Sequence, residues 1–199
     1  MTALTKKERE TLLILFKDFA TFYNANSISK ILGISRVGAM KILKKLSNQG
    51  ILEYKAIGKS IVYKLRLEDD YVRKLIAFVL ADEAYKFKRW KEEFKELSKK
   101  DRVVIMYGSV IKDYAKASDI DIMIVIKKSD YKKVNKILEE KQKIIPKKIH
   151  SIELTATDLL DNIKQKKKAV IDIIKNAVIL YGQDKYVEVI KNVAGFQAY

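Results

Sequence analysis

The stretch VVIMYGSVIKDYAKASDIDIMIVI, residues 103–126, decides the fold of the second half of this chain. A first apolar run leads directly into Gly108-Ser109, and after nine intervening residues a second apolar run begins with Asp119-Ile-Asp121. Short runs rich in Val and Ile predict buried β-strands, and the residues between them predict a short helical piece. A turn explains Gly-Ser alone and a solvated strand edge explains Asp-Ile-Asp alone, but the two motifs at this spacing between strands indicate a site.

The chemistry available to this segment is that of phosphates and hard cations. Because successive strand side chains alternate between faces, Asp119 and Asp121 are expected on one face, with their backbones about 7 Å apart. Two such carboxylates can share divalent cations. Gly108 lets the backbone approach a phosphate closely, and Ser109 with the following helix N-terminus offers a hydroxyl and free N–H groups to its oxygens.

The segment resembles the signature of the DNA polymerase β-type nucleotidyltransferase superfamily, especially its minimal nucleotidyltransferase domains, over roughly residues 101–183. The resemblance implies an α+β or α/β domain with a mixed sheet and flanking helices. It also implies Mg²⁺ (or Mn²⁺) at Asp119 and Asp121, and a nucleoside triphosphate as substrate or ligand. The reaction would transfer a nucleoside monophosphate to an unknown acceptor with two magnesium ions. The implied nucleotide-binding residues are Gly108, Ser109, Lys112 and Ser118.

The same resemblance implies a third carboxylate on a later strand, expected at residues 148–154. Glu153 would stand there, completing the metal and catalytic set of Asp119, Asp121 and Glu153 and helping to deprotonate the acceptor. His150, the chain's single histidine, faces away from Glu153 on strand alternation, so we interpret it as a packing or surface residue.

Two residues depart from the family pattern. The third carboxylate is usually Asp but is Glu153 here, and Asp113 stands where a glycine is usual. These departures favour an alternative function, that of a non-catalytic transcriptional regulator. In that alternative the nucleotidyltransferase fold binds a nucleotide or only supports assembly.

Residues 1–67 predict three helices followed by a hairpin. Apolar spacing predicts a first helix from about Thr5 to Tyr23, a second that Ser27 caps, and a third that Ser35 caps. Two short strands then flank the basic glycine turn AIGK, residues 56–59. This order, together with the segment SISKILGISR at residues 27–36, resembles the winged helix-turn-helix of transcriptional regulators.

A recognition helix needs an apolar back and a basic front that fits the major groove. In the third predicted helix, Arg36 is expected at a base edge, and the lysines of this helix and of the wing are expected at phosphates. Docking of another protein is the alternative use of the same fold. The predicted DNA-binding residues are Ser35, Arg36, Lys41, Lys44, Lys45, Lys55 and Lys59.

Residues 69–100 are charged, free of Pro and Gly, and periodic, which predicts one or two amphipathic helices. They would form a homodimer or pack between the two domains. The expected organisation is therefore a winged helix at 1–67, a helical connector at 68–100 and a nucleotidyltransferase domain at 101–199.

The composition indicates the class of partner. The net charge of +16 over 199 residues favours polyanionic partners, here duplex DNA and a nucleoside triphosphate. Richness in Lys, Glu and Ile is also typical of thermophile surfaces. The absence of cysteine excludes thiolate metal sites. No apolar run reaches the roughly 20 residues that span a bilayer, so we expect a cytoplasmic protein with no membrane partner.

Overall fold

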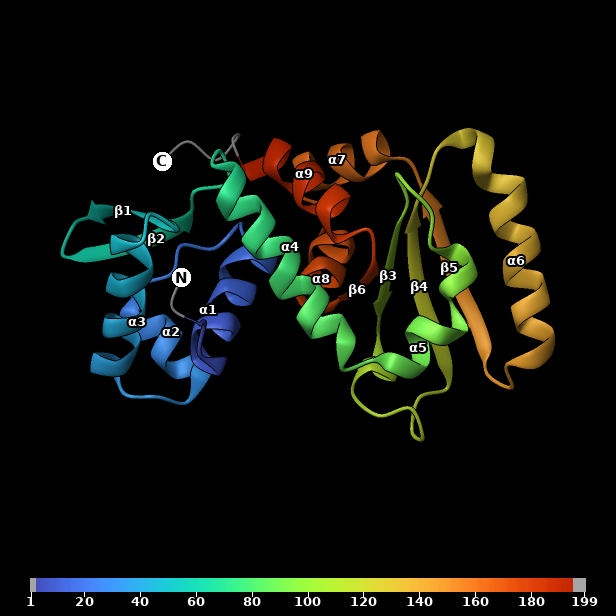
Figure 1. The fold of residues 1–199 in the computed structure, drawn as a ribbon, viewed down its shortest axis with the longest axis horizontal. Helices are drawn as coiled ribbons and strands as arrows, with labels where there is room; N and C mark the ends of the chain where they lie inside the picture. The colour runs from blue at the N-terminus through green and yellow to red at the C-terminus, as the bar shows by residue number, and fades with distance from the viewer. Residues whose placement is uncertain (1–2, 195–199) are drawn as a thin grey trace. The chain divides into compact units, whose positions relative to one another are not determined.

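The computed structural model describes residues 3–194 (Figure 1). The chain divides into two compact units, of which one ends at Val79 and the other begins at Leu80. Each unit has its own buried apolar residues. We therefore describe each unit by itself.

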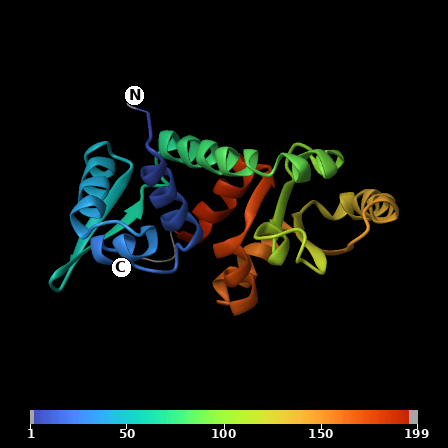
Figure 2. The same ribbon diagram turned by 90° about the horizontal axis from the view of Figure 1, so that it is seen from below.

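The first unit contains three helices and a two-stranded antiparallel hairpin, in the order predicted from the sequence. Its elements are α1 (Lys6–Lys17), α2 (Ala25–Leu32), α3 (Arg36–Asn48), β1 (Leu52–Ile57) and β2 (Ser60–Leu65). The hairpin lies beside α3, as Figure 2 also shows. Its turn contains Gly58 at φ +56°, a left-handed conformation that glycine adopts without steric cost.

Helix caps fix the starts of these helices. Thr5 and Glu8 form a reciprocal capping box at α1, and Ser35 caps α3 by accepting from Gly38 N at 3.0 Å. The cap of α2 differs from the prediction: Asn24 is the N-cap, and Ser27 is its capping-box partner three residues later. Both residues are good caps, so the sequence did not discriminate between them.

Helix α1 is shorter than predicted, because it ends at Lys17 rather than near Tyr23. Tyr23 is extended and forms an antiparallel bridge with Tyr63 of β2, whose amide donates to Tyr23 O at 2.9 Å. The Tyr23 hydroxyl also donates to Asp18 at 2.6 Å. Pairing with a distant strand thus replaces the last helical turns.

The predicted connector is divided between the two units. It comprises α4 (Asp70–Tyr85), α5 (Lys88–Glu93) and the 3₁₀ turn η1 (Lys95–Leu97). The unit boundary falls within α4. Because Trp90, Phe94 and Leu97 are buried in the core of the second unit, α5 and η1 belong to that unit.

The second unit is built on a four-stranded mixed sheet of order β5-β4-β3-β6. Strands β3 (Val103–Tyr107) and β4 (Asp119–Val125) are antiparallel, β6 (Val178–Tyr181) is antiparallel to β3, and β5 (Lys148–Leu154) is parallel to β4. The other elements are η2 (Ser109–Ile111), η3 (Lys128–Asp130), α6 (Tyr131–Ile144), α7 (Ala156–Lys164), α8 (Lys168–Asn176) and α9 (Gln183–Ala194).

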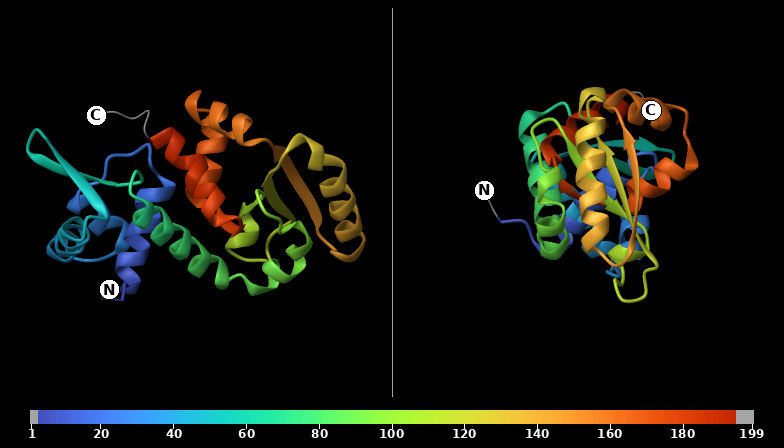
Figure 3. Two further views of the ribbon diagram at one scale, coloured as in Figure 1. Left: turned by 45° about the horizontal axis from the view of Figure 1, so that its top comes forward. Right: turned by 90° about the vertical axis from the view of Figure 1, so that its right-hand side faces the viewer.

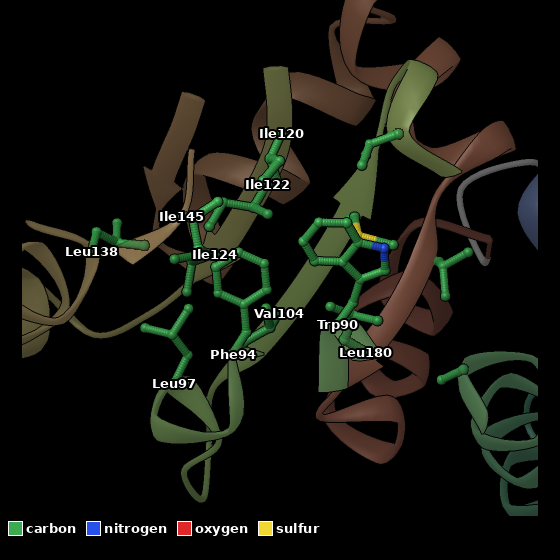
Figure 4. Packing of buried hydrophobic residues seen from close by; sticks show 14 of the residues in the cluster. Trp90, Phe94, Leu97, Val104, Ile120, Ile122, Ile124, Leu138, Ile145 and Leu180 are labelled. Atoms are coloured by element: carbon green, nitrogen blue, oxygen red, sulfur yellow. The ribbon is translucent and has the colours of Figure 1, made fainter. Parts of the chain in front are cut away.

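Helices cover both faces of this sheet (Figure 3). One face presents Ile120, Ile122 and Ile124 of β4 to a core that includes Trp90 and Phe94, and residues of α6 complete it (Figure 4). On the other face α9 contacts β3, and α7 packs against α9. The side chains of Asp119 and Asp121 belong to this second face, because they alternate with the isoleucines.

Within residues 3–194, none of the helices combines the length and the apolar character that crossing a membrane requires.

Candidate functional site

The two aspartates predicted from the sequence lie at one end of the sheet, where β3 ends and β4 begins. Asp121 pairs with Tyr107, the last residue of β3, and Asp119 is the first residue of β4. The side chain of Asp119 is 28% exposed and that of Asp121 is 23% exposed. The pair is therefore open to a ligand while its backbone is held in the sheet.

Gly108 brings the Gly-Ser turn directly against this pair. Its φ is +78° and its ψ −163°, a region open essentially only to glycine. A Cβ placed on it would lie 2.1 Å from Oδ2 of Asp121. The carboxylate thus occupies the space that any other residue would need, and the turn and the acidic pair form one site.

Mutual repulsion and burial shape the electrostatics of the pair. Burial and then the charge of Asp119 raise the pKa of Asp121, while His150 opposes that shift. Burial, Asp121 and Asp119 likewise raise the pKa of the Tyr107 phenol. A negative potential that penalises further negative charge is the environment in which a bound cation is stabilised.

A histidine, rather than the predicted carboxylate, lies beside the two aspartates. Because β5 runs parallel to β4 with Asp121 opposite His150, the histidine shares the aspartates' face. Its Nδ1 lies 3.4 Å from Asp119 Oδ2 and 3.7 Å from Asp121 Oδ1. His150 faces away from Glu153, as predicted, but it lies beside the two aspartates, which its interpretation as a packing or surface residue did not include.

Glu153 does not join the pair, which corrects the prediction that it completes the metal and catalytic set. It pairs with Ile124, on the opposite face of the sheet and further along the strand. Its Oε1 is buried without a hydrogen-bond partner among residues 3–194, and the Tyr131 hydroxyl donates to its backbone carbonyl at 3.3 Å. Its carboxylate is thus directed away from Asp119 and Asp121.

The residues at this end of the sheet fit a divalent cation. Among the described residues, Asp119, Asp121 and His150 form a group whose ligand atoms all lie within 4.8 Å of one another. Two carboxylates supply oxygen ligands and a neutral imidazole supplies a nitrogen ligand. The donor set therefore suits a metal, although its third member differs in chemistry from the expected carboxylate.

Comparison with known proteins supports this architecture. Residues 90–186 match the family model described as polymerase beta, nucleotidyltransferase. The second unit has a nucleotidyltransferase-type fold. No curated protein matches the chain. The structure of a cysteine-to-serine mutant of Lactococcus lactis ZitR aligns with a TM-score of 0.34 and 15% identity, over 72% of this chain and 77% of that one, a likeness too weak to carry an argument.

The segment between the Gly-Ser turn and Asp119 in this nucleotidyltransferase-type unit is ordered by its own hydrogen bonds. The predicted helical piece is a single 3₁₀ turn, η2, rather than a helix. Asp113 accepts from Ala115 N at 3.0 Å, which explains an aspartate where the family usually has glycine. Ser109, Lys112 and Ser118 are exposed around this segment.

Lys147, which was not among the predicted site residues, also holds this segment. Its Nζ donates to Tyr114 O at 2.7 Å and to Ala117 O, and it lies over the Tyr114 ring at 4.6 Å. Lys147 directly precedes β5, so it ties the loop before Asp119 to the strand that carries His150. No sequence pattern links residues this far apart.

In the first unit, the outer face of α3 carries exposed side chains that include three of the predicted DNA-binding residues. Arg36, Lys41 and Lys44 are exposed, and so are the apolar side chains of Val37 and Met40 between them. Ala39, Leu43 and Leu46 are buried on the inner face. The predicted separation of a basic front from an apolar back is therefore present.

Lys45 does not belong to that exposed face. Its Nζ lies 2.6 Å from Oε1 of Glu8, whose side chain is only 4% exposed. Although burial alone would raise the pKa of Glu8, the hydrogen bonds from Lys45 and Thr5 lower it below its ordinary value. Lys45, whose side chain is 38% exposed, therefore neutralises a buried carboxylate, which argues against its predicted role as a phosphate contact.

The remaining predicted DNA-binding residues lie at the start of α3 and on the hairpin. Ser35 uses its hydroxyl to accept from Gly38 N as the α3 cap. Lys55 on β1 and Lys59 in the turn are exposed, as is the ring of Tyr54. The hairpin thus presents charge and apolar surface together.

Proposed function

We propose that the second unit binds a nucleoside triphosphate through a divalent cation at Asp119 and Asp121. The observation that carries the proposal is the contact between the Gly108-Ser109 turn and the Asp121 carboxylate, since a Cβ at Gly108 would lie 2.1 Å from Oδ2 of Asp121. A turn able to approach a phosphate thus borders the carboxylates able to hold its counter-cation.

The reaction class that these residues suit is nucleotidyl transfer. The metal, when bound, would supply charge stabilisation for the attacking and leaving oxygens. Asp119 and Asp121 would hold it in place, and Gly108 leaves room for the Asp121 carboxylate beside the turn. Ser109 offers a hydroxyl to the same oxygens, and Lys112 and Ser118 extend the proposed nucleotide-binding set.

Calorimetry with a non-hydrolysable triphosphate, with and without Mg²⁺ or Mn²⁺, tests this proposal. Asp121→Asn should lose most of the metal-dependent affinity, because it removes one of the two formal charges that hold the cation. Glu153→Gln is the matched control, since it removes one carboxylate from the opposite face of the same sheet. Equal binding by the parent protein and Asp121→Asn would refute the proposal.

A second candidate function is that of a non-catalytic regulator, in which the unit binds nucleotide without transferring it. It is favoured by the position of Glu153, because a positioned base contributes about 10²–10⁴-fold to a rate and no third carboxylate joins the group among residues 3–194. Incubation with α-labelled triphosphates and cell extract discriminates the two. Label on an acceptor indicates transfer, whereas tight binding without any labelling indicates the regulator.

We further propose that the first unit is a winged helix that binds duplex DNA through α3 and the hairpin. The support is the exposed set of Arg36, Lys41 and Lys44 on α3, beside Lys55 and Lys59 on the hairpin. We expect Arg36, at the start of α3, to reach base edges and the lysines to contact phosphates.

Neighbouring lysines provide the test. Anisotropy titrations over a salt series should show that Lys44→Met reduces the slope of log affinity against log salt by about 0.9, the contribution of one phosphate. Lys45→Met should leave the slope unchanged at a temperature where the protein remains folded, because Lys45 pairs with Glu8. Absent or salt-independent binding would indicate protein docking instead.

We also propose that two copies of this chain form a homodimer through residues 69–100. In α4 every seventh residue is an exposed aromatic, namely Tyr71, Phe78 and Tyr85, so the three rings share one face of the helix. A second copy of that helix would cover the rings by the same face, as a twofold interface requires. Sedimentation of Phe78→Glu should show monomer where the parent protein is dimeric.

A further inference from the structure

We infer that His150 is the third ligand of the metal site and that the site therefore prefers Mn²⁺, Co²⁺ or Zn²⁺ to Mg²⁺. This inference rests on the proposed metal-dependent nucleotide binding and concerns which cation serves it. The sequence resemblance implies a third carboxylate and a magnesium-type site, so the inference departs from that expectation.

The parallel register of β4 and β5 places the imidazole at the aspartates. Because Asp121 is directly opposite His150 and Asp119 opposite Lys148, one histidine projects from the same face as both carboxylates. Its Nδ1 lies 3.4 Å from Asp119 Oδ2 and 3.7 Å from Asp121 Oδ1. Ligand atoms bound to one cation at about 2.1 Å lie roughly 3.0–3.4 Å apart, so only small movements bring these three onto a metal.

The position of His150 suits a ligand better than a packing residue. Its side chain is 45% exposed, so it is not part of a core. The carboxylate of β5, Glu153, pairs with Ile124 on the opposite face and cannot take its place. Within the described part of the chain, Asp119 and Asp121 have His150 as the third member of their metal-ligand group.

An imidazole ligand at this position predicts which cations the site prefers. Mg²⁺ requires near-ideal octahedral oxygen coordination and gives up its water reluctantly, whereas imidazole suits later transition ions and Zn²⁺. Affinities of a mixed nitrogen and oxygen site also rise from Mn²⁺ towards Cu²⁺ along the first-row series. The presence of His150 in place of the expected carboxylate should therefore lower the affinity of the site for Mg²⁺ and raise its affinity for these competing ions.

Direct metal titration of the full chain measures the preference without any activity assay. Calorimetry with each metal alone, and the visible absorption of Co²⁺, report affinity and nitrogen ligation. The parent protein should bind Co²⁺ and Mn²⁺ more tightly than Mg²⁺. His150→Ala should lose Co²⁺ affinity by at least the roughly 10–100-fold that loss of even an outer-shell partner costs.

Two further variants separate the outcomes. His150→Asp restores three carboxylates, so it should improve Mg²⁺ binding and narrow the preference for Co²⁺. Glu153→Gln should change the affinity for neither Mg²⁺ nor Co²⁺, because that side chain lies on the other face of the sheet. Equal affinity for Mg²⁺ and Co²⁺ in the parent, or no effect of His150→Ala, overturns the inference and leaves the proposed function intact. Absence of any divalent binding in the parent overturns both.

Discussion

Substitution of Gly108 by alanine should remove metal and nucleotide binding through a defined steric conflict. The new Cβ would lie 2.1 Å from Asp121 Oδ2, so the carboxylate has to move. The backbone at φ +78° and ψ −163° adds strain of about 1–3 kcal/mol for a residue other than glycine. We therefore expect a lower melting temperature together with a loss of metal affinity of roughly 10–100-fold or more, since a displaced ligand should cost at least as much as a lost outer-shell partner.

Gly182→Ala is the matched control for this experiment. Gly182 also has a positive φ, +79°, and its added Cβ would lie 2.1 Å from the backbone oxygen of Arg102. This variant should lose comparable or greater stability, because a backbone oxygen is harder to displace than a carboxylate. Calorimetry below both melting temperatures then compares the metal affinities of the two variants. If Gly108→Ala bound metal as tightly as Gly182→Ala, the proposal that the Gly-Ser turn and the Asp121 carboxylate form one site would be refuted.

The remaining predictions concern ion pairs and charges outside the acidic pair. Because the pKa of Glu8 is lowered in the folded protein, its ionised form stabilises the fold at pH values above the ordinary glutamate range. This contribution should be lost as the pH falls through the lowered pKa. Glu8→Gln should therefore flatten that part of a curve of unfolding free energy against pH, measured by denaturant titration. Lys147→Met should cost about 1.5–3 kcal/mol for the lost charged hydrogen bonds and increase amide exchange near Tyr114, whereas unchanged exchange would contradict the role of Lys147 in holding this loop. Arg36→Ala should erode the difference in affinity between specific and random duplexes, while Lys44→Ala weakens both alike.

The features predicted correctly from the sequence depend on residues close together in the chain. The alternation of Asp119 and Asp121 with isoleucines places both aspartates on one strand face, and that placement depends only on the two-residue period of a strand. The Ser35 cap and the apolar inner face of α3 were predicted for the same reason. The mixed sheet with flanking helices follows from such local signals taken together.

The errors arose where pairing between distant segments decides the structure. The strand KIHSIEL has an isoleucine and polar residues on each face, so its own pattern does not indicate which face meets the aspartates. The register with β4 decides between His150 and Glu153, and that register is a tertiary property. Lys44 and Lys45 are likewise identical in chemistry, and only the buried Glu8 on another helix distinguishes them.

The register also separates the two activities proposed for the second unit. The Gly-Ser turn, Asp119 and Asp121 all come from the continuous segment 103–126 and are held by one antiparallel strand pair, whereas the proposed third metal ligand, His150, comes from β5. The general base that the family resemblance implies, Glu153, comes from β5 and lies on the opposite face of the sheet. The proposed nucleotide binding therefore does not depend on Glu153, whereas the proposed transfer would lack the base expected there. Metal affinity and labelling of an acceptor consequently have to be measured separately, since the first does not imply the second.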